Sequence, residues 1–130
     1  MDSIECLTLA IICLTLALIL FFYKTFKEDI TNNPKKVLGT SFHNYTINAS
    51  FYELTDLFGL PLISFEEKVN YEWNLTYEGV SFTLYDWKYY RPLLVEEPIE
   101  WHIGTKTKSE SEIVKNKIEI LLKNEVEKRT

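Results

Sequence analysis

The chain has 130 residues, which leaves room for one domain. Its 19 acidic and 14 basic residues give a net charge of −5, which argues against a nucleic-acid partner, because nucleic-acid-binding domains carry clustered positive charge. The two cysteines, Cys6 and Cys13, lie in or beside an apolar N-terminal run, so we expect no disulfide in the folded part.

The apolar run near the N-terminus is the first predicted element. Residues 7–22, LTLAIICLTLALILFF, contain no charged residue, no glycine and no proline. With Ile4 and Tyr23 the run approaches the roughly 20 residues that a helix needs to cross a hydrocarbon core. A signal peptide would show a basic start and a small-residue cleavage site, and neither is present. We expect a single-pass transmembrane helix over residues 4–23, with a signal peptide or a buried helix as alternatives.

Two sets of residues bear on the side of the membrane that the following domain would face. Positive charge flanks only the C-terminal side of the run, which favours a cytoplasmic domain with its lysines near anionic lipid head groups. These lysines are Lys24, Lys27, Lys35 and Lys36. Three Asn-x-Ser/Thr sequons, at Asn44, Asn48 and Asn74, would be used only in a lumen. We expect a membrane protein with a cytoplasmic C-terminal domain, and N-glycosylation only if this orientation is wrong.

A polar linker and a compact domain are expected after the apolar run. The linker covers residues 24–36 and includes Asn-Asn-Pro, and the domain covers residues 37–130. VLGTSFHNYTIN, residues 37–48, is a candidate first strand. A capping box of Ser50 and Glu53 then begins a short helix over FYELTDLF.

The middle of the domain predicts a hairpin and a third strand. VNYEWNLTY and VSFTLYDWK alternate in polarity and are separated only by Glu78-Gly79, which is typical of a tight β-turn. EWHIG, residues 100–104, follows a loop over residues 89–99 and predicts a strand beside the hairpin.

The C-terminal segment predicts a long helix, which completes the expected fold. A capping box of Ser109 and Glu112 begins the helix, and apolar residues recur along it at helical spacing. We therefore expect an α+β fold in which a small antiparallel sheet, built around a central hairpin at residues 69–88, carries helices packed on one face.

Pairing across the Glu78-Gly79 turn sorts the hairpin side chains onto two faces. The core face carries the large apolar residues Val69, Tyr71, Trp73, Leu75, Tyr77, Val80, Phe82 and Leu84. With EWHIG beside the hairpin, the other face brings together Glu72, Tyr85, Trp87 and His102. A carboxylate, a histidine and two aromatic rings on an exposed face form a candidate binding surface. The alternative is that loop 89–99 covers these rings and makes them a small core of its own.

A catalytic alternative rests on Asp86-Trp87-Lys88. Metal-dependent nucleases place an acid on one strand and an acid-x-Lys on the next, so that carboxylates hold a divalent cation beside the lysine. Glu72 is the candidate partner acid, but strand alternation puts Glu72 and Asp86 on opposite faces. The sequence contains no Gly-rich phosphate loop and no pair of histidines at metal-ligand spacing. We expect no enzymatic activity, no cofactor and no bound metal, and keep the nuclease as a weak alternative.

Five short motifs follow one another in a set order: LFGLP, YEW, EG, LYDWK and WHIG, from residue 57 to residue 104. In order and spacing they resemble an uncharacterised family of small proteins from tailed phages and large DNA viruses. The resemblance covers about residues 50–122. It implies a viral origin and an α+β fold centred on a hairpin, and it implies no activity for any residue.

These observations combine into one expected function with two alternatives. We expect a single-pass, membrane-anchored viral protein that presents a small non-catalytic domain, which binds a protein partner or a small ligand through the face around Tyr85, Trp87 and His102. The first alternative is a purely structural component of a virion membrane. The second is the metal-dependent nuclease. The sequence gives no indication of which partner would bind.

Overall fold

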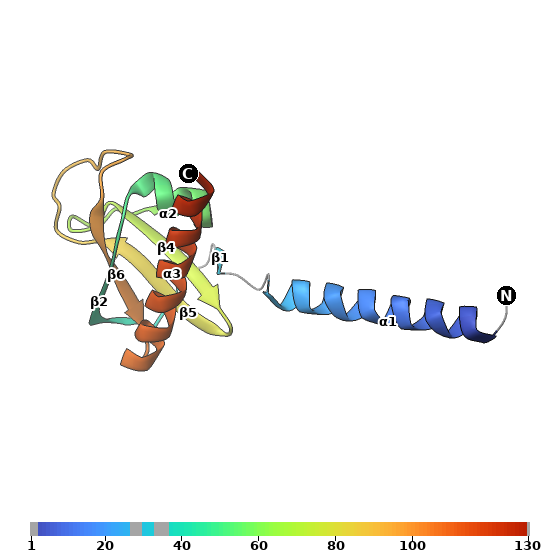
Figure 1. The fold of residues 1–130 in the computed structure, drawn as a ribbon. Coiled ribbons are helices and arrows are strands. Elements are labelled where there is room, and N and C mark those ends of the chain that lie inside the picture. The colour runs from blue at the N-terminus through green and yellow to red at the C-terminus, as the bar shows by residue number, and fades with distance from the viewer. Residues whose placement is uncertain (1–2, 27–29, 33–36, 130) are drawn as a thin grey trace.

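The computed structural model describes residues 3–26, 30–32 and 37–129 (Figure 1). Within these residues it contains three helices and one antiparallel sheet of six strands, so the expected α+β class is confirmed. The helices are α1 (Ser3–Phe26), α2 (Phe51–Phe58) and α3 (Lys108–Arg129). The strands are β1 (Thr31–Asn32), β2 (Ser41–Ala49), β3 (Leu62–Ile63), β4 (Tyr71–Tyr77), β5 (Val80–Asp86) and β6 (Ile99–Thr105).

The sheet has the strand order β1-β4-β5-β6-β2, and β3 pairs with β4 beside β1. The predicted hairpin is confirmed in register, because Tyr77 pairs with Val80 and Trp73 with Leu84 across β4 and β5. Both turn residues have a positive φ, 47° at Glu78 and 80° at Gly79. A two-residue turn with two positive φ angles matches the twist of the strands that it joins, which is why this dipeptide fixes the hairpin.

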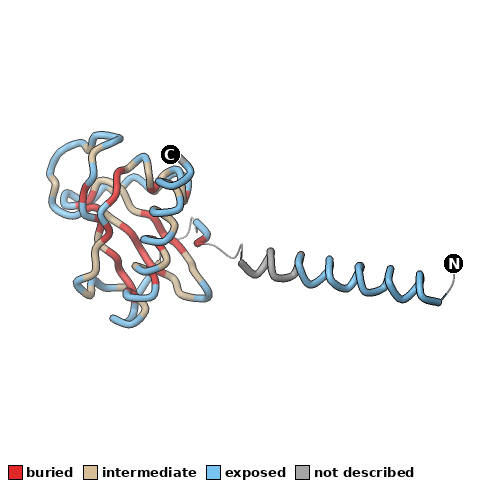
Figure 2. The backbone as a smooth tube through the Cα atoms, in the orientation of Figure 1, coloured by how far each residue is buried: buried red, intermediate tan, exposed pale blue. Residues whose placement is uncertain are grey.

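Helices α2 and α3 cover one face of the sheet, and the core lies between them and the strands (Figures 1 and 2). Trp73 and Trp101 are fully buried there, with ring centroids 5.2 Å apart in an edge-to-face arrangement. Each indole N–H donates to a carbonyl next to an end of α2: Trp101 to Ala49 and Trp73 to Gly59, both at 2.8 Å. The expected core face is therefore correct from Tyr71 to Leu84, and its tryptophans also fix the position of α2; Val69 is buried but lies outside this core cluster.

Both helices of the domain begin at a capping box, but one lies earlier than expected. At α2 the predicted box is confirmed, because Ser50 and Glu53 exchange both hydrogen bonds. At α3 the two bonds join Thr107 and Glu110, so the predicted box of Ser109 and Glu112 is wrong by two residues. The sequence TKSESE contains the Ser/Thr-x-x-Glu pattern twice, and the earlier copy is used. Ser111 in the first turn of α3 is buried, and its hydroxyl forms a hydrogen bond with that of Thr105.

The segment before the expected domain boundary takes part in the fold. Ile30 is buried in the core, and β1 pairs with β4. The Asn32 side-chain amide donates to the carbonyls of Phe58 and Leu60, at 2.9 and 3.2 Å. Residues 30–32 therefore belong to the domain, although the sequence analysis placed them in the polar linker. Of the remaining linker residues, 24–26 form the end of α1, and 27–29 and 33–36 lie outside the described part.

Helix α1 extends away from the sheet (Figure 1), and its apolar side chains from Ile4 to Ile19 are exposed. In the part of the chain that the structure describes, no helix meets the length and apolarity needed to cross a membrane. The expected anchor over residues 4–23 and the membrane location inferred from it are therefore contradicted.

Candidate functional site

The face of the sheet opposite α2 and α3 carries four aromatic side chains that lie against one another. Tyr85 of β5 and His102 of β6 are directly opposite in the strand register. Phe42 comes from β2, and Trp87 follows the end of β5. We call the surface formed by Phe42, Tyr85, Trp87 and His102 the aromatic face.

His102 is the centre of the aromatic face. Its ring is stacked on Phe42, with centroids 4.0 Å apart and an angle of 11° between the rings. Trp87 lies 5.9 Å away at 27°, and Tyr85 contacts the His102 ring edge-on at 5.4 Å. Because β6 runs between β5 and β2, Trp87 and Phe42 approach His102 from opposite sides. Phe42, His102 and Trp87 thus form one stack across three strands, and Tyr85 packs edge-on against it.

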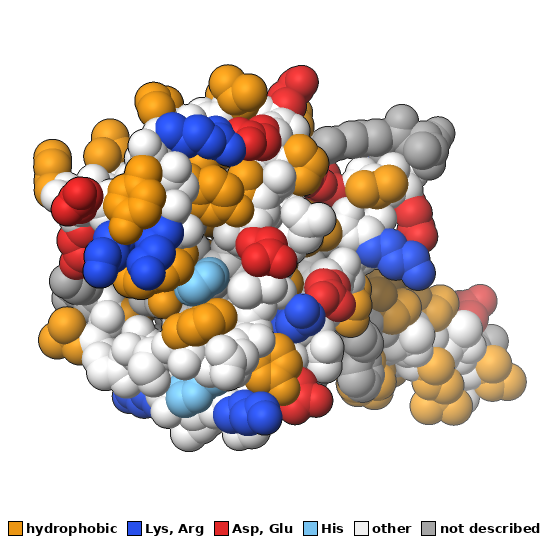
Figure 3. Space-filling model, turned by 90° about the vertical axis from the view of Figure 1, so that its left-hand side faces the viewer, with side chains coloured by type: hydrophobic (Ala, Val, Ile, Leu, Met, Phe, Trp, Pro, Cys, Tyr) orange, Lys and Arg blue, Asp and Glu red, His pale blue; other side chains and the backbone are white. Residues whose placement is uncertain are grey.

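Two lysines border the Trp87 ring. The ammonium groups of Lys68 and Lys88 each lie 5.7 Å from its centroid, within the range of a cation–π contact. The Lys88 N–H donates to the Lys68 carbonyl at 2.8 Å, which ties the two segments together. Both histidines are visible in Figure 3, and one lies between hydrophobic side chains beside a group of basic side chains.

A cavity of about 350 Å³ adjoins the aromatic face. Its walls are the segment 37–40 and the loop 64–69, and its floor includes Glu72, Thr83 and Tyr85. The Val37 N–H donates to the Asn74 side-chain oxygen at 3.2 Å, so the segment crosses this face of the sheet and leaves the cavity beside it.

Burial and charge shift the pKa values of two residues on the aromatic face. The pKa of Tyr85 is raised, mainly because its hydroxyl is partly buried and also because Glu72 is directly opposite on β4. The pKa of His102 is lowered, because burial between the rings disfavours the charged imidazolium more than Glu100 stabilises it. The surroundings of His102 therefore favour its neutral form.

The structure brings all four predicted site residues together: Glu72 pairs with Tyr85, Tyr85 pairs with His102, and Trp87 contacts both rings. The sequence analysis missed Phe42. A β-bulge between Phe42 and Thr46 changes the alternation along β2, so strand periodicity alone does not show which way Phe42 faces. Asn44 has a φ of 68° at this bulge, a conformation that asparagine adopts more readily than most residues.

Loop 89–99 does not cover the aromatic face. Its apolar residues Tyr89 and Leu93 pack against the core on the helix side, and the Val95 carbonyl accepts a hydrogen bond from the N–H of Tyr52 in α2. Phe42 keeps 38% and Trp87 37% of its surface exposed. The alternative in which this loop makes the rings a private core is therefore wrong.

Asp86 has a structural role. Its carboxylate is buried and accepts hydrogen bonds from the backbone N–H groups of Asn70 and Tyr71, both at 2.9 Å, and from the Asn70 side chain at 2.8 Å. It thereby holds the start of β4 against the end of β5. Glu72 projects from the other face, and among the described residues no group of three or more His, Cys, Asp or Glu side chains is placed to hold a metal ion.

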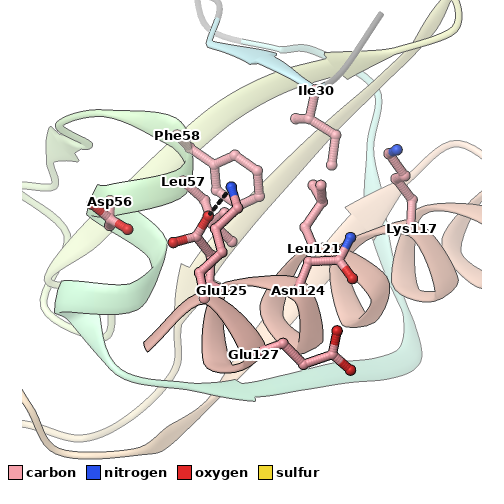
Figure 4. Close-up of a pocket in the computed structure, with 10 residues that line it drawn as sticks. Ile30, Asp56, Leu57, Phe58, Lys117, Leu121, Asn124, Glu125 and Glu127 are labelled. Carbon is pink, nitrogen blue, oxygen red and sulfur yellow. Dashed lines mark hydrogen bonds and ion pairs between the residues drawn. The ribbon is translucent and has the colours of Figure 1, made fainter. Parts of the chain in front are cut away.

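A second cavity, of about 710 Å³, lies between α2 and α3 (Figure 4). Leu57 and Phe58 of α2, Leu121 of α3 and Ile30 line it with apolar side chains. Its rim carries both acids and bases, and in one such pair the Glu125 carboxylate and the Lys128 ammonium group lie 3.4 Å apart. This mixture of charges does not indicate whether a ligand would be an anion or a cation.

The sequons differ in accessibility. Asn44 and Asn48 of β2 are exposed, whereas Asn74 is 1% exposed. The folded domain therefore leaves no room for a glycan on Asn74. The four lysines that oriented the expected anchor lie outside the described side chains.

Comparisons with protein-family models, with curated proteins and with solved structures found no match to this chain. The resemblance to phage and large-virus proteins stays a prediction that rests on the motifs. The motifs have structural roles here: LFGLP supplies the Gly59 carbonyl that accepts a hydrogen bond from Trp73 of YEW, EG makes the hairpin turn, LYDWK supplies Tyr85, Asp86 and Trp87, and WHIG supplies Trp101 and His102.

Proposed function

We propose that this chain is a binding protein whose aromatic face holds an extended segment of a partner protein. The supporting observation is the cluster of four rings, three of them stacked, on the sheet face that the helices leave uncovered. Tryptophan and tyrosine supply much of the binding energy in protein interfaces, because a rigid ring buries a large area with little loss of side-chain entropy.

The exposure of the rings supports a role in binding over a role in folding. Two of the three tryptophans are fully buried, whereas Trp87 and Phe42 each leave more than a third of their surface in water. Apolar surface that stays exposed does not stabilise the folded chain. A partner that buries this surface on binding gains the free energy of removing it from water. A purely structural domain has no need of this arrangement.

The proposal assigns no catalytic role to the face. The His102 ring is flanked by Phe42 and Trp87, and its lowered pKa keeps it neutral. A neutral imidazole held between rings acts as a flat packing surface. Asp86 is the acid of the Asp-x-Lys part of the nuclease pattern. Its carboxylate already accepts hydrogen bonds from backbone N–H groups.

Selection from a library of displayed random peptides on the immobilised full-length chain tests the proposal. Peptides enriched on the wild type should be lost on Trp87→Ala and on Phe42→Ala, since both variants remove a ring of the stack. They should be retained on Tyr52→Ala, which removes an aromatic ring of similar exposure from the helix side. No enriched peptide, or equal enrichment on Trp87→Ala, would contradict the proposal.

Thermal unfolding of the same variants separates binding from folding. A variant of the aromatic face should keep a cooperative transition within a few degrees of the wild type, because about 1 kcal/mol moves the midpoint of a domain of this size by roughly 4–8 °C. Loss of cooperativity in Trp87→Ala would show that the ring belongs to the core and would overturn the proposal.

A further inference from the structure

Helix α1 is built from a seven-residue repeat. Residues 4–10, IECLTLA, and residues 11–17, IICLTLA, are identical at six of seven positions. Seven residues complete almost two turns of an α-helix, so a repeat of this length keeps each kind of side chain on one side of the helix. The same period is found in helices that pack along one another in coiled coils. The repeat is therefore typical of a helix that packs along another helix.

The repeat places large apolar side chains in two stripes along α1. The first stripe is formed by Leu7, Ile11, Leu14 and Leu18, and the second by Leu9, Ile12, Leu16 and Ile19. Each of these side chains keeps between 50% and 65% of its surface exposed. Corresponding members of the two stripes are separated by five residues, or roughly 140° around the helix axis. A single neighbouring helix would therefore cover only one stripe.

The polar side chains of the repeat do not oppose burial of α1. The Thr8 hydroxyl donates to the Ile4 carbonyl at 2.9 Å. One repeat later, the Thr15 hydroxyl makes the same bond to the Ile11 carbonyl, also at 2.9 Å. A neighbouring helix can thus bury both threonines without leaving a hydroxyl donor unpaired. Residues 7–19 contain no charged side chain, so burying them removes no charge from water.

The other helices of the described chain do not supply a partner for these stripes. Helix α2 has only eight residues, and its buried side chains Leu54 and Phe58 belong to the core. Helix α3 is long enough, but its buried side chains Val114 and Ile118 already pack against the sheet. Helix α1 extends away from both (Figure 1). A helix of the same period that can match both stripes is α1 of another copy of this chain.

We propose that α1 is an oligomerisation helix, which packs along the α1 helices of at least two other copies of this chain. Identical helices carry the same seven-residue period, so the side chains of one stripe can fit between those of the next helix along the whole repeat. In a bundle of three or more helices each α1 has two neighbours, and both stripes are covered. A helix that is apolar on all sides is normally buried in this way.

The inference does not depend on the proposed function, and it has a consequence for that function. An oligomer carries several aromatic faces. A partner protein with several binding segments would engage more than one face at once and would be held more tightly than by a single domain.

Sedimentation equilibrium of the full-length chain in detergent-free buffer tests the proposal. At micromolar concentration the wild type should contain three or more chains per assembly. The diagnostic variant exchanges two pairs of neighbours, by the substitutions Cys13→Leu, Leu14→Cys, Ala17→Leu and Leu18→Ala. This variant keeps the composition and the apolar content of α1 and interrupts the first stripe half-way. It should need a concentration about ten-fold higher, or more, for the same degree of assembly.

A second exchange is the matched control. Thr15→Ala combined with Ala17→Thr also keeps the composition of α1, but both positions lie outside the two stripes. This variant should assemble as the wild type does. The three tryptophans all lie in the domain after α1, so near-ultraviolet circular dichroism should be the same in every variant. A loss of assembly in the diagnostic variant is then separated from unfolding of the domain.

Three results would overturn the inference. The first is a wild type that sediments as a monomer or a dimer. The second is equal assembly of the wild type and the diagnostic variant, which would show association through apolar content and not through the repeat. The third is a monomeric chain that floats with phosphatidylcholine vesicles, which would assign the apolar surface of α1 to lipid. None of these results affects the peptide selection on the aromatic face, so the proposed function fails or holds separately.

Discussion

His102 couples the stability of the domain to pH. Its pKa in the folded chain is lowered by burial, with Glu100 opposing, and Lys68, Lys88 and Glu72 are the other charged groups around the ring stack. In the unfolded chain the pKa returns to about 6.5. As the pH falls, His102 is therefore protonated in the unfolded state before it is protonated in the folded state. The contribution of neutral His102 to the free energy of unfolding is complete above about pH 6.5 and is lost as the pH falls through the lowered pKa.

The pH dependence of the free energy of unfolding, measured by urea titration, tests this. Between pH 7 and 5 the wild type should lose more stability than His102→Gln, which has no proton to gain. Equal slopes in wild type and His102→Gln would show that the ring is not held neutral by the stack.

Gly104 is required by the close approach of β5 and β6. A Cβ atom at this position would lie inside van der Waals contact with the Thr83 hydroxyl oxygen, directly opposite on β5 and buried. Gly104→Ala should destabilise the domain by about 1–3 kcal/mol through overpacking. Thr83→Ala removes the opposing oxygen, so the double variant should be less destabilised than the sum of the two single variants. Additive losses in urea unfolding would place the cost elsewhere.

At the scale of elements, the hairpin turn carries a small strain. Glu78 has a φ of 47°, a left-handed conformation that asparagine adopts more readily than glutamate. Asn-Gly is also the preferred dipeptide for this turn. Glu78→Asn should stabilise the domain by about 0.5–1 kcal/mol in urea unfolding. Glu96→Asn, on a loop outside the turn, should stay within about 0.5 kcal/mol of the wild type.

The elements that the sequence predicts well are those with a strong local signal. Glu78-Gly79 fixes the register of β4 and β5, and that register places Glu72 opposite Tyr85 and sends Trp73 to the core. β1 and β3 have two residues each, too few for any periodicity, so neither was predicted. Phe42 was missed for a similar reason, since the bulge in β2 interrupts the alternation that assigns faces. The candidate site was thus predictable along the hairpin and not at its far edge.

At the scale of the whole molecule, the boundary of the domain depends on long-range contacts. Composition placed the start at Val37, because residues 24–36 are polar and contain Asn-Asn-Pro. Ile30 is an isolated apolar residue in that segment, and only the three-dimensional structure shows it against Phe58 and Leu121 at the cavity between α2 and α3 (Figure 4). Local patterns do not encode a contact of this separation.

The contribution of this segment can be measured in the full-length chain. Ile30→Ala should cost about 2–3 kcal/mol in urea unfolding, because it removes a buried side chain that packs where α2 and α3 meet. Leu38→Ala is the matched control: it also deletes an aliphatic side chain near the start of the domain, but Leu38 is 75% exposed, so the loss should stay within about 0.5 kcal/mol. If both variants lose little free energy of unfolding, the domain begins at Val37 as the sequence predicts. A large loss for Ile30→Ala alone would show that residues 30–32 complete the core between α2 and α3. The domain would then begin at residue 30, before the segment 37–40 that crosses the aromatic face.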